Sequence, residues 1–387
     1  MPEMIPPTGR VHWLCAGLST GSGLSRLAEQ ASAVTLWNCH TEKAATLAAR
    51  FGLAGRIDVA AFSPEALSAR LAPGDTIVCL LPVTTHPEIV CLAFAARSHY
   101  VSTSYVSPEV AALAEDMRTK GLACVVESGL DPGIDHLLAH RLVGEAESAL
   151  GEGPAEIAFH SYCGGFPVAV TPFRYKFSWA PAGVLLALAA PATWIKNGGA
   201  VVAHQPWEAT RLHEIGGERF EAYPNRDSRP FVAQYGMRQS WYVRDFVRGT
   251  LRLEGWKAAW QEVFAAVRDG DRGRIAALAG RLARDHSYYP DEPDRVVMSV
   301  TLSARRAGRL VWQGGYTLEL RGDAGESAMA RSVSQTAAIA ALDVLAGRAM
   351  RGLGRAVHLK RDVARWSAAL AESGIVPASA PCRVAAA

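Results

Sequence analysis

The sequence lacks an excess of either charge, and it lacks a long apolar run. Its 387 residues carry 40 Lys and Arg against 37 Asp and Glu, which gives a formal charge of +3. So close a balance argues against a nucleic-acid surface or an anionic membrane as the main partner. The N-terminal MPEMIPPTGR has no apolar signal-peptide segment, and no apolar run elsewhere is long enough to span a bilayer. We therefore expect neither nucleic acid nor a membrane as a partner.

Closely spaced cysteines are also lacking. The seven cysteines are dispersed, with no CxxC pair and no metal-ligand spacing. An odd, scattered set is typical of reduced thiols in a cytoplasm and not of a disulfide framework. The sequence thus predicts a cytoplasmic protein that holds no metal ion, and it shows no internal repeat.

What is present indicates two domains of an enzyme-like chain. A length of 387 residues is too great for one ordinary hydrophobic core. Hydrophobic residues make up 49% and charged residues 20%, a composition typical of soluble globular proteins. Near residue 155 the pattern changes, from short apolar runs between helical segments to strand-like runs rich in aromatic residues.

The first part alternates regularly between apolar strands and helices. Strands are expected at 11–16, 33–38, 56–60, 76–81, 99–102 and 123–127, with helices at 24–31, 40–50, 64–71, 87–97 and 108–120. This alternation predicts a parallel sheet covered on both faces. Ligands of such sheets bind beyond the carboxyl ends of the strands, so the turns at 82–84, 103–105 and 128–131 should lie along the ligand-binding edge.

A glycine-rich turn follows the first strand. Gly17 precedes Ser19-Thr20-Gly21-Ser22-Gly23, after which a helical pattern begins. Strand, turn and helix are the parts of a dinucleotide phosphate site, because glycines let the backbone approach the pyrophosphate and helix N-terminal N–H groups bind it. The spacing departs from GxGxxG, since position 15 is Cys and position 19 is Ser. Alone it is a weak signal, because Gly-Ser turns before helices are common.

The end of the second strand bears on the choice of cofactor. NAD enzymes usually place an acid there to bind the ribose 2′-hydroxyl. Here the residues are Asn38-Cys39-His40, with no acid to repel a 2′-phosphate and no arginine to hold one. NADP is therefore permitted, and NAD remains possible.

The stretch VVESGLDPGIDHLLAH, residues 125–140, contains the most distinctive turn. Pro132 disfavours the helical conformation at Asp131, so this acid is expected on a rigid turn. An acid followed by proline is also a common helix start, so Asp131 could be only an N-cap. The alternative is a catalytic or binding carboxylate, and spacing alone leaves both interpretations open.

The second part reads as a mixture of strands and helices. A strand is expected at 157–165, a helix at 181–190 and a proline-bounded loop at 223–230. RVVMSVTLSA and LVWQGGYTLELRG resemble paired antiparallel strands around the turn RAGR. Residues 327–348 form a strong amphipathic helical pattern.

Seven stretches, in one order over most of the chain, resemble saccharopine dehydrogenase of the L-glutamate-forming type, also called saccharopine reductase. They are LLPVTTHPEI (80–89), STSYVSPE (102–109), GLDPGIDHLLA (129–139), SYCGG (161–165), YKFSWAPAGVLLAL (175–188), YPNRDS (223–228) with VRGTLRLEGW (247–256), and SAMARSV (327–333). The resemblance implies an α/β fold, in which a Rossmann-like parallel-sheet dinucleotide-binding domain carries an inserted α/β substrate domain with a mixed sheet. The expected boundaries are 1–134, 135–340, and 341–387 for a segment returning to the first domain.

The reaction implied by the resemblance belongs to lysine metabolism. It converts saccharopine, NADP⁺ and water to L-glutamate, 2-aminoadipate 6-semialdehyde and NADPH, and the biosynthetic direction is the reverse. The partner would be a small amino-acid substrate, and a homodimer is a possible assembly.

The chain departs from the family pattern at three places. The stretch that usually carries Asn-Pro-Leu-Gly is compressed to FPVAVTPFR (166–174), the first loop glycine is missing, and Cys39 stands where an arginine is often found. Two alternatives therefore stay open. One is a related enzyme for a carboxynorspermidine-type or opine-type secondary amine, and the other is a non-catalytic nucleotide-binding protein.

The resemblance also implies roles for individual residues. The candidate catalytic residues are Asp131, as a proton-handling or amine-binding carboxylate, Tyr105 and Cys163. The candidate substrate-binding residues are Ser104, Arg226, Lys176 and Ser178. The candidate cofactor-binding residues are Gly17, Leu18, Ser19, Thr20, Asn38, Cys39, Pro82, Val83, Thr84 and Ser128.

Several of these residues have a simpler interpretation. Arg226 could be a solvated loop residue paired with Asp227, although a guanidinium is well suited to bind a carboxylate in a bidentate manner. Tyr105 could satisfy a backbone group, and Cys163 could pack as a small hydrophobic residue. His136 could position the helix after the Asp131 turn together with Asp135.

Overall fold

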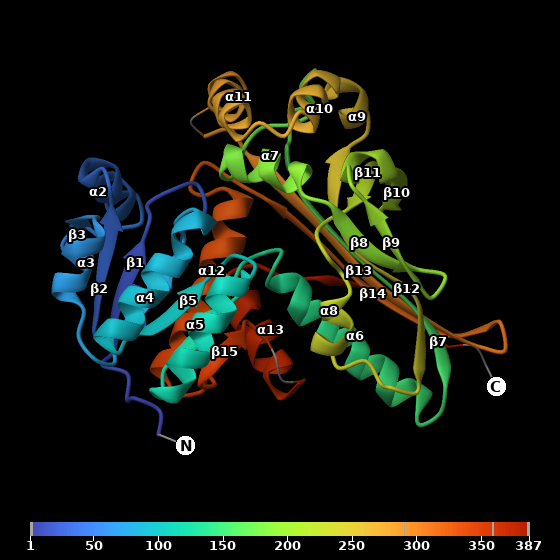
Figure 1. Cartoon of the computed structure of the whole chain (residues 1–387), viewed down its shortest axis with the longest axis horizontal. Helices are drawn as coiled ribbons and strands as arrows, with labels where there is room; N and C mark the ends of the chain where they lie inside the picture. Colours follow the sequence, from blue (N-terminus) through green and yellow to red (C-terminus); the bar gives the residue numbers. More distant parts are fainter. Residues whose placement is uncertain (1–2, 290, 358–359, 385–387) are drawn as a thin grey trace. The chain divides into compact units, whose positions relative to one another are not determined.

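The computed structural model describes residues 3–289, 291–357 and 360–384, which form two compact units (Figure 1). The first unit comprises Met1–Ile134, Met329–His358 and Ala364–Gly374, and the second comprises Asp135–Ala328, Leu359–Val363 and Ile375–Ala387. The division differs from the expected boundaries at two points. The chain returns to the first unit near 329 and not at 341, because the helix beginning there packs on the first unit. Residues 375–384 belong to the second unit because the strand at 378–384 joins its sheet.

The first unit is built on a seven-stranded parallel sheet in the order β15-β6-β5-β4-β1-β2-β3. Its strands are β1 (Arg10–Leu14), β2 (Ala33–Asn38), β3 (Asp58–Ala61), β4 (Thr76–Cys79), β5 (His99–Ser102), β6 (Ala123–Val126) and β15 (Gly352–Arg355). Every pairing is parallel. The order reverses beside β1, as in the Rossmann arrangement, which confirms the fold class expected for this part.

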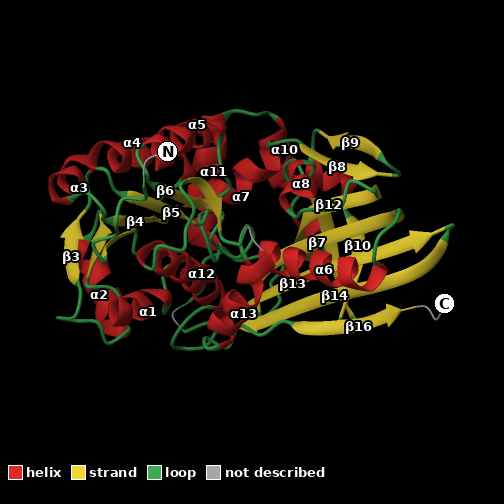
Figure 2. Ribbon diagram, turned by 90° about the horizontal axis from the view of Figure 1, so that it is seen from below, coloured by secondary structure: helices red, strands yellow, loops and turns green. Residues whose placement is uncertain are grey.

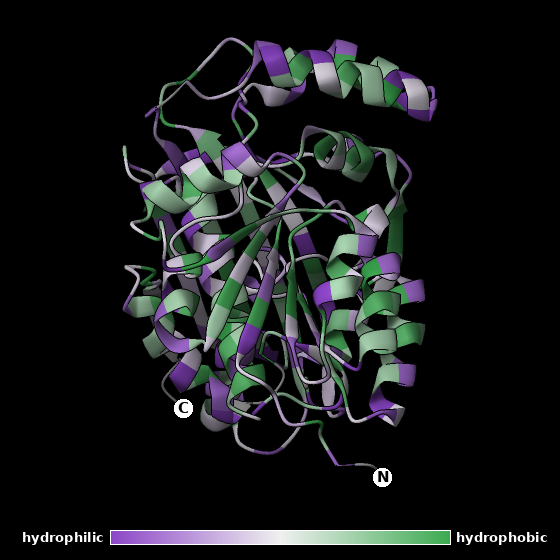
Figure 3. Ribbon diagram, turned by 90° about the vertical axis from the view of Figure 1, so that its left-hand side faces the viewer, coloured by the Kyte–Doolittle hydropathy of each residue, from purple (hydrophilic) through white to green (hydrophobic). Residues whose placement is uncertain are grey.

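Helices connect these strands and cover both faces of the sheet. They are α1 (Gly23–Gln30), α2 (Thr41–Arg50), α3 (Pro64–Arg70), α4 (His86–Ala96), α5 (Pro108–Thr119), α12 (Ala328–Leu345) and α13 (Val363–Ala371), with the short turn η1 (Val83–Thr85). The short turn η3 (Lys360–Asp362) belongs to the second unit. Figure 2 shows α4 and α5 on one face, and α1 and α12 on the other. Because both faces are covered, β4, β5 and β6 are buried along their whole length. Hydrophilic and hydrophobic stretches alternate along the helices, as expected for helices with one buried side (Figure 3).

Asp75 anchors the amino end of this sheet. It is fully buried, and its carboxylate accepts hydrogen bonds from Thr8 Oγ1 at 2.7 Å and from Arg10 Nε and Nη2 at 2.9 Å. His12 Nδ1 accepts the Trp37 indole N–H at 3.1 Å, so its Nε2 carries the proton that it donates to Asp75 at 3.2 Å. Burial by itself would raise the pKa of Asp75, but the bonds from His12, Thr8 and Arg10 outweigh it and hold this pKa well below its usual value.

We expect Asp75→Asn to lower the free energy of unfolding by about 3 kcal/mol at pH 7, because Arg10 and His12 lose the charge of their buried partner. A pKa that is depressed in the folded state stabilises the protein above the unfolded value near 4 and loses that contribution as the pH falls further. Urea unfolding between pH 7 and pH 3 measures this free energy for both proteins. The difference between the wild type and the variant should become smaller as the pH falls below 4. A difference in the free energy of unfolding that stays constant over this range would contradict the stabilising role of the Asp75 carboxylate.

The second unit is built on a mixed sheet, as expected, whose main path is β10-β11-β12-β7-β13-β14-β16. Its strands are β7 (Ala155–Pro167), β8 (Ala192–Lys196), β9 (Gly199–Ala203), β10 (Arg211–Ile215), β11 (Glu218–Pro224), β12 (Trp241–Leu253), β13 (Asp294–Arg306), β14 (Arg309–Arg321) and β16 (Ala378–Val384). Strands β12 and β7 are parallel, and the other pairings are antiparallel. The expected pairing around the turn RAGR is confirmed, since β13 and β14 are antiparallel over their whole length.

Helices of the second unit cover one face of the sheet and one of its ends (Figure 1). They are α6 (Ile134–Leu150), α7 (Pro181–Ala189), α8 (Pro230–Gln234), α9 (Trp256–Ala259), α10 (Gln261–Arg268) and α11 (Arg272–Asp285), with the turn η2 (Pro206–Ala209). Helices α7, α10 and α11 enclose an aromatic core that includes Tyr175, Trp256 and Trp260. Three helices therefore lie between 256 and 285, where the sequence pattern indicated no element. Among the described residues, no helix has the length and apolar character needed to cross a membrane.

Candidate functional site

Four expected segments of the first unit follow neighbouring parallel strands. Residues 17–20 follow β1, residues 82–84 follow β4, residues 103–105 follow β5 and residues 128–131 follow β6. These strands are adjacent in the order β6-β5-β4-β1. Because the strands are parallel, the four segments lie along one edge of the sheet, which is where a doubly wound α/β unit binds its ligand.

Tyr105 and Asp131 meet on this edge. The Tyr105 hydroxyl donates a hydrogen bond of 2.6 Å to Asp131 Oδ1, although the residues are 26 positions apart. Both side chains are half-buried, so a small molecule from solvent could reach the carboxylate. The pair combines a hydroxyl donor with a carboxylate, which is a combination suited to accepting and returning a proton.

The turn that carries Asp131 is closed by backbone bonds. Gly129 N–H donates to the Pro132 carbonyl at 2.8 Å, and the Asp131–Pro132 peptide bond is cis. Gly133 has a φ of 149°, and a Cβ added there would lie 2.0 Å from the Gly129 oxygen. Because α6 begins at Ile134, the capping position belongs to Gly133. Asp131 lies two positions before Gly133, in the turn itself.

The turn after β1 has a backbone that suits a nucleotide. Cys15 has a φ of 92°, a conformation that glycine adopts readily and other residues rarely. Cys15 thus follows the backbone path of the missing glycine. A Cβ added at Gly23 would lie 2.0 Å from the Ser334 carbonyl oxygen, so α1 and α12 approach closely only because residue 23 has no side chain.

The side chains expected at this cofactor edge differ in what they do. Gly17 and Leu18 are exposed and Ser19 is half-buried, so their backbones are accessible. Thr20 is buried instead, because its hydroxyl donates to the Cys15 carbonyl at 2.7 Å and accepts from Trp13 Nε1 at 3.1 Å. Its side chain therefore braces the turn.

Asn38 links two loops at the end of β2. Its Oδ1 accepts from Ala16 N–H at 3.3 Å, and its Nδ2 donates to the His40 carbonyl at 2.9 Å. Cys39 is exposed beside it. No carboxylate lies between residues 38 and 41, so the edge has no acid there that would repel a 2′-phosphate.

The remaining cofactor candidates lie after β4 and β6. Pro82, Val83 and Thr84 are exposed in the turn η1. His86 follows this turn and is buried, with its Nε2 2.9 Å from the Leu81 carbonyl oxygen. Burial lowers the pKa of His86, so the ring supports the turn in its neutral form. Ser128 is fully buried, and its N–H donates to the Ser102 carbonyl at 3.0 Å.

In the second unit, one face of the sheet presents two buried arginines. The register of β12 with β7 places Arg248 beside Ser161 and Thr250 beside Cys163. Every second residue of a strand points to the same face of the sheet, so Arg248, Thr250 and Arg252 share one face. Cys163, which pairs with Thr250, lies on that face as well. Both arginines are buried, with exposed fractions of 2% and 5%.

Arg248 is neutralised within the unit. Its guanidinium forms an ion pair with Asp135, which is fully buried, and it stacks over the Phe231 ring at 4.0 Å. His136 follows Asp135, and its Nδ1 lies 2.9 Å from the Tyr235 hydroxyl. Asp135 thus ties the start of α6 to β12, and His136 ties it to Tyr235 at the end of α8.

Arg252 has a different environment. Its guanidinium lies 4.9 Å from the Tyr175 ring centre and 5.5 Å from those of Tyr223 and Trp256. Nη1 donates to the Leu251 carbonyl at 3.0 Å, and within the described part of the chain no carboxylate forms an ion pair with Arg252. Aromatic faces compensate only part of the cost of burying a cation, so this group is suited to receive an anion.

Buried polar atoms without a hydrogen bond accompany Arg252 in this part of the second unit. They include Arg252 Nε, Trp256 Nε1 and Ser178 Oγ. Ser178 is among the residues expected from the sequence, whereas Arg252 is not, although the stretch VRGTLRLEGW contains it. A signal was available, because Arg248 and Arg252 are four positions apart in a strand-like stretch and must therefore share one face of the sheet.

The other substrate candidates already have neighbours in the protein. Lys176 Nζ donates to Glu292 at 2.7 and 2.5 Å, so a carboxylate 116 positions away neutralises it. Arg226 is exposed, with a φ of 56° and its carbonyl bound to Thr193 N–H at 2.8 Å. Asp227 pairs with Arg229 at 2.7 Å, so the pairing of Asp227 with Arg226 that the sequence suggested is not the one present.

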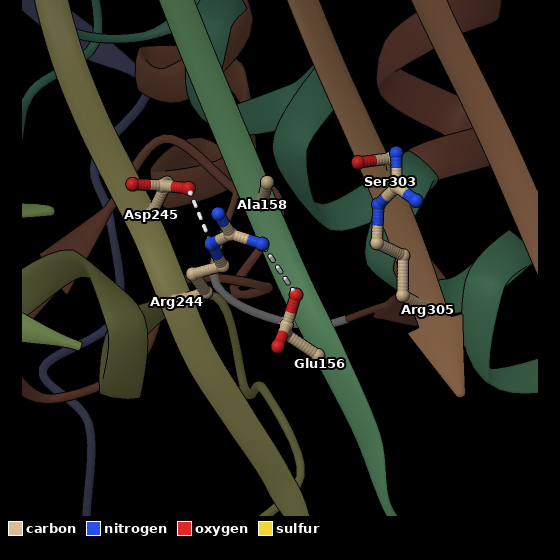
Figure 4. Close-up of a pocket in the computed structure, with 6 residues that line it drawn as sticks. All are labelled: Glu156, Ala158, Arg244, Asp245, Ser303 and Arg305. Carbon is tan, nitrogen blue, oxygen red and sulfur yellow. Dashed lines mark hydrogen bonds and ion pairs between the residues drawn. The ribbon is translucent and has the colours of Figure 1, made fainter. Parts of the chain in front are cut away.

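A polar depression of about 240 Å³ lies on the opposite face of this sheet. Its lining residues are Glu156, Ala158, Arg244, Asp245, Ser303 and Arg305. Arg244 binds Glu156 at 2.9 Å and approaches Asp245 at 3.5 Å, as the dashed lines show (Figure 4). Because these charges pair with one another and lie away from Arg252, the depression is separate from the candidate site. Among the described residues, no group of three His, Cys, Asp or Glu side chains could hold a metal ion.

Comparisons with known proteins agree with this arrangement. The model of the saccharopine dehydrogenase NADP binding domain matches residues 11–125, and that of the saccharopine dehydrogenase C-terminal domain matches residues 129–375. A saccharopine dehydrogenase [NADP(+), L-glutamate-forming] of Pyricularia oryzae is 37% identical over 256 residues, which are 64% of this chain and 55% of that protein. The one from Saccharomyces cerevisiae is 38% identical over 198 residues, or 50% of this chain and 43% of that protein. The chain thus matches about half the length of these relatives.

Solved structures extend the likeness to nearly the whole fold. The apo saccharopine dehydrogenase (L-Glu forming) from Saccharomyces cerevisiae superimposes with a TM-score of 0.78 at 26% identity, over 96% of this chain and 99% of that one. A homospermidine synthase from Legionella pneumophila in complex with NAD has a TM-score of 0.63 at 9% identity, over 98% and 92% of the two chains. At 9% identity the second likeness shows the fold alone.

Proposed function

The chain belongs to the saccharopine dehydrogenase family, and on that premise we propose that it oxidises saccharopine with NADP⁺ and water. The products would be L-glutamate and 2-aminoadipate 6-semialdehyde. The family assignment covers both units, because its two domain models together match residues 11–125 and 129–375. The observation that carries the proposal is the hydrogen bond between Tyr105 and Asp131 at the ligand-binding edge of the parallel sheet.

The reaction needs a group that accepts protons. Oxidation removes a hydride from the carbon beside the secondary amine and leaves an imine, to which water adds before the C–N bond breaks. The secondary ammonium must lose a proton before the first step, and the attacking water must lose one in the second. Asp131 is proposed to take these protons, while Tyr105 holds the carboxylate in one orientation.

Three carboxylates of saccharopine must also be bound. Arg252 is proposed as the main clamp, because it is buried and forms no ion pair with a described carboxylate. Arg226 is proposed as a second clamp, since it is exposed on its loop. Cys163 lies on the same sheet face as Arg252 and would line the site. Ser104 and Ser178 would donate hydroxyl hydrogen bonds, and Lys176 would act together with its partner Glu292.

NADP would supply the hydride acceptor when bound. Its pyrophosphate would lie against the backbone of Gly17, Leu18 and Ser19, with Thr20 bracing the turn from below. Asn38 and Cys39 would border the ribose that carries the 2′-phosphate. Pro82, Val83, Thr84 and Ser128 would border the nicotinamide side of the edge.

The proposal is tested by the absorbance of reduced nicotinamide. Purified protein, saccharopine and either NADP⁺ or NAD⁺ should give saccharopine-dependent reduction, faster with NADP⁺ because residues 11–125 match the NADP binding domain of the family. A carboxynorspermidine-type and an opine-type amine serve as comparison substrates. Turnover of one of these without turnover of saccharopine would overturn the substrate assignment, and cofactor binding without turnover of any amine would overturn the enzymatic one.

The homodimer and the cytoplasmic location stay proposals as well. The six cysteines whose side chains the structure describes form no disulfide, which supports a reducing compartment.

A further inference from the structure

Two loops must be held together if Tyr105 is to bind Asp131. Tyr105 follows β5, and Asp131 follows β6. Strands β5 and β6 pair through Tyr100 with Cys124 and through Val101 with Val125, so the register ends before either loop begins. The contact at 2.6 Å therefore depends on interactions between the loops themselves.

Glu127 makes these interactions on both sides of Tyr105. Its backbone N–H donates to the Ser104 carbonyl at 3.1 Å, and its Oε1 accepts from Val106 N–H at 3.4 Å. One residue thus holds the residues immediately before and after Tyr105. The next residue, Ser128, continues the connection through its N–H, which donates to the Ser102 carbonyl at 3.0 Å.

The backbone and burial of Glu127 are both unusual. Its φ is 57°, which places it in the left-handed region that a residue with a side chain seldom adopts. Its exposed fraction is 1%, although buried glutamates are rare unless they are paired. Such costs persist only where surrounding contacts hold the residue in place.

Arg355 supplies that support. Its Nε lies 3.0 Å from Glu127 Oε2, and its strand β15 pairs with β6 so that Arg355 stands beside Val126. The ion pair balances the buried carboxylate and fixes the direction in which Oε1 meets the loop of Tyr105. Residues 127 and 355 are 228 positions apart, so only the folded sheet brings them together.

We propose that Glu127, held by Arg355, is a positioning residue that sets the Tyr105 hydroxyl against Asp131. The proposal rests on the proposed function for its catalytic meaning, but its geometry can be tested without turnover. Its action is proposed to pass through the backbone of residues 104–106, which it binds on both sides of Tyr105. Ser104 is a proposed substrate contact on the same loop, so the ion pair would also set the place of that hydroxyl.

Glu127→Gln is the informative substitution, because it keeps the size and the acceptor oxygen but removes the charge that binds Arg355. We expect kcat to fall by about 10- to 100-fold while KM for NADP⁺ changes less than 3-fold, since a displacement of about 1 Å can cost two orders of magnitude. Arg355→Met should have the same effect, and Arg355→Lys should recover part of the loss. Arg10→Met is the matched control, because Arg10 also pairs with a buried carboxylate of this sheet but at the opposite ends of the strands. It should lower stability and leave kcat unchanged.

The decisive kinetic measurement places Glu127→Gln in a Tyr105→Phe background. If Glu127 acts through the Tyr105 hydroxyl, the double variant should be no slower than Tyr105→Phe within about 2-fold, whereas general damage to the unit would multiply the two losses. Multiplied losses overturn the proposal. Crystal structures of the wild type and of Glu127→Gln give a readout independent of activity. Separation of the Tyr105 hydroxyl from Asp131 in the variant supports the proposal, and an unchanged hydrogen bond overturns it. An inactive wild type would count against the proposed function, and the crystal structures would still decide the positioning role.

Discussion

Asp131→Asn should lower kcat for saccharopine oxidation by about 10²- to 10⁴-fold, the usual contribution of a positioned general base. The amide keeps the shape of the side chain and can still accept the 2.6 Å hydrogen bond from Tyr105, so the turn should stay intact. Only the capacity to take a proton is lost. Steady-state rates are measured from NADPH absorbance. A lower kcat with a KM for NADP⁺ unchanged within about 3-fold would establish that Asp131 takes the proton.

Asp116→Asn is the control for Asp131→Asn, because Asp116 is an exposed acid on α5 of the same unit. The control should match the wild type in both rate and melting temperature. Should Asp131→Asn retain kcat within about 3-fold of the wild type, the proton-handling role of Asp131 would have to be abandoned. A loss confined to KM for saccharopine would instead make Asp131 a ligand of the substrate amine.

Arg252→Met should raise KM for saccharopine by about 10²- to 10³-fold, because the truncation of a buried charge that binds an oppositely charged group costs about 2–5 kcal/mol. Methionine fills similar space among Tyr175, Tyr223 and Trp256. Since no described carboxylate pairs with Arg252, the substitution leaves no buried anion behind. The melting temperature should therefore be unchanged or higher.

Arg248→Met provides the contrast within the same strand. Arg248 is the ion-pair partner of the fully buried Asp135, so its removal leaves an unpaired buried charge and should cost about 3–5 kcal/mol of stability. Thermal unfolding of the two variants side by side separates a ligand-binding arginine from a structural one. If Arg252→Met melts as low as Arg248→Met and binds saccharopine with the wild-type KM, Arg252 is structural and the proposed clamp is wrong.

The local patterns of the sequence were sufficient to predict most of the first unit. The runs at 76–81, 99–102 and 123–127 contain β4, β5 and β6, which are buried along their whole length because both faces of the sheet are covered. The second unit was less predictable, since two of its helices, α9 and α10, are short and the aromatic core draws residues from several segments. The amphipathic pattern at 327–348 was confirmed as α12, but it did not indicate to which unit the helix belongs.

In the candidate site too, some features follow from the sequence alone and others only from the tertiary structure. The sequence by itself determined the turn at Asp131-Pro132-Gly133, the glycine-rich turn after the first strand and the absence of an acid at residues 38–41, because each depends on neighbouring residues only. The tertiary structure alone decided which charges are paired. Glu292 neutralises Lys176, Asp135 neutralises Arg248, and Tyr105 binds Asp131, whereas Arg252 lies among aromatic rings. The physical reason is that periodicity reports the burial of a side chain, whereas its electrostatic partner comes from a segment that only the fold brings within a few ångströms.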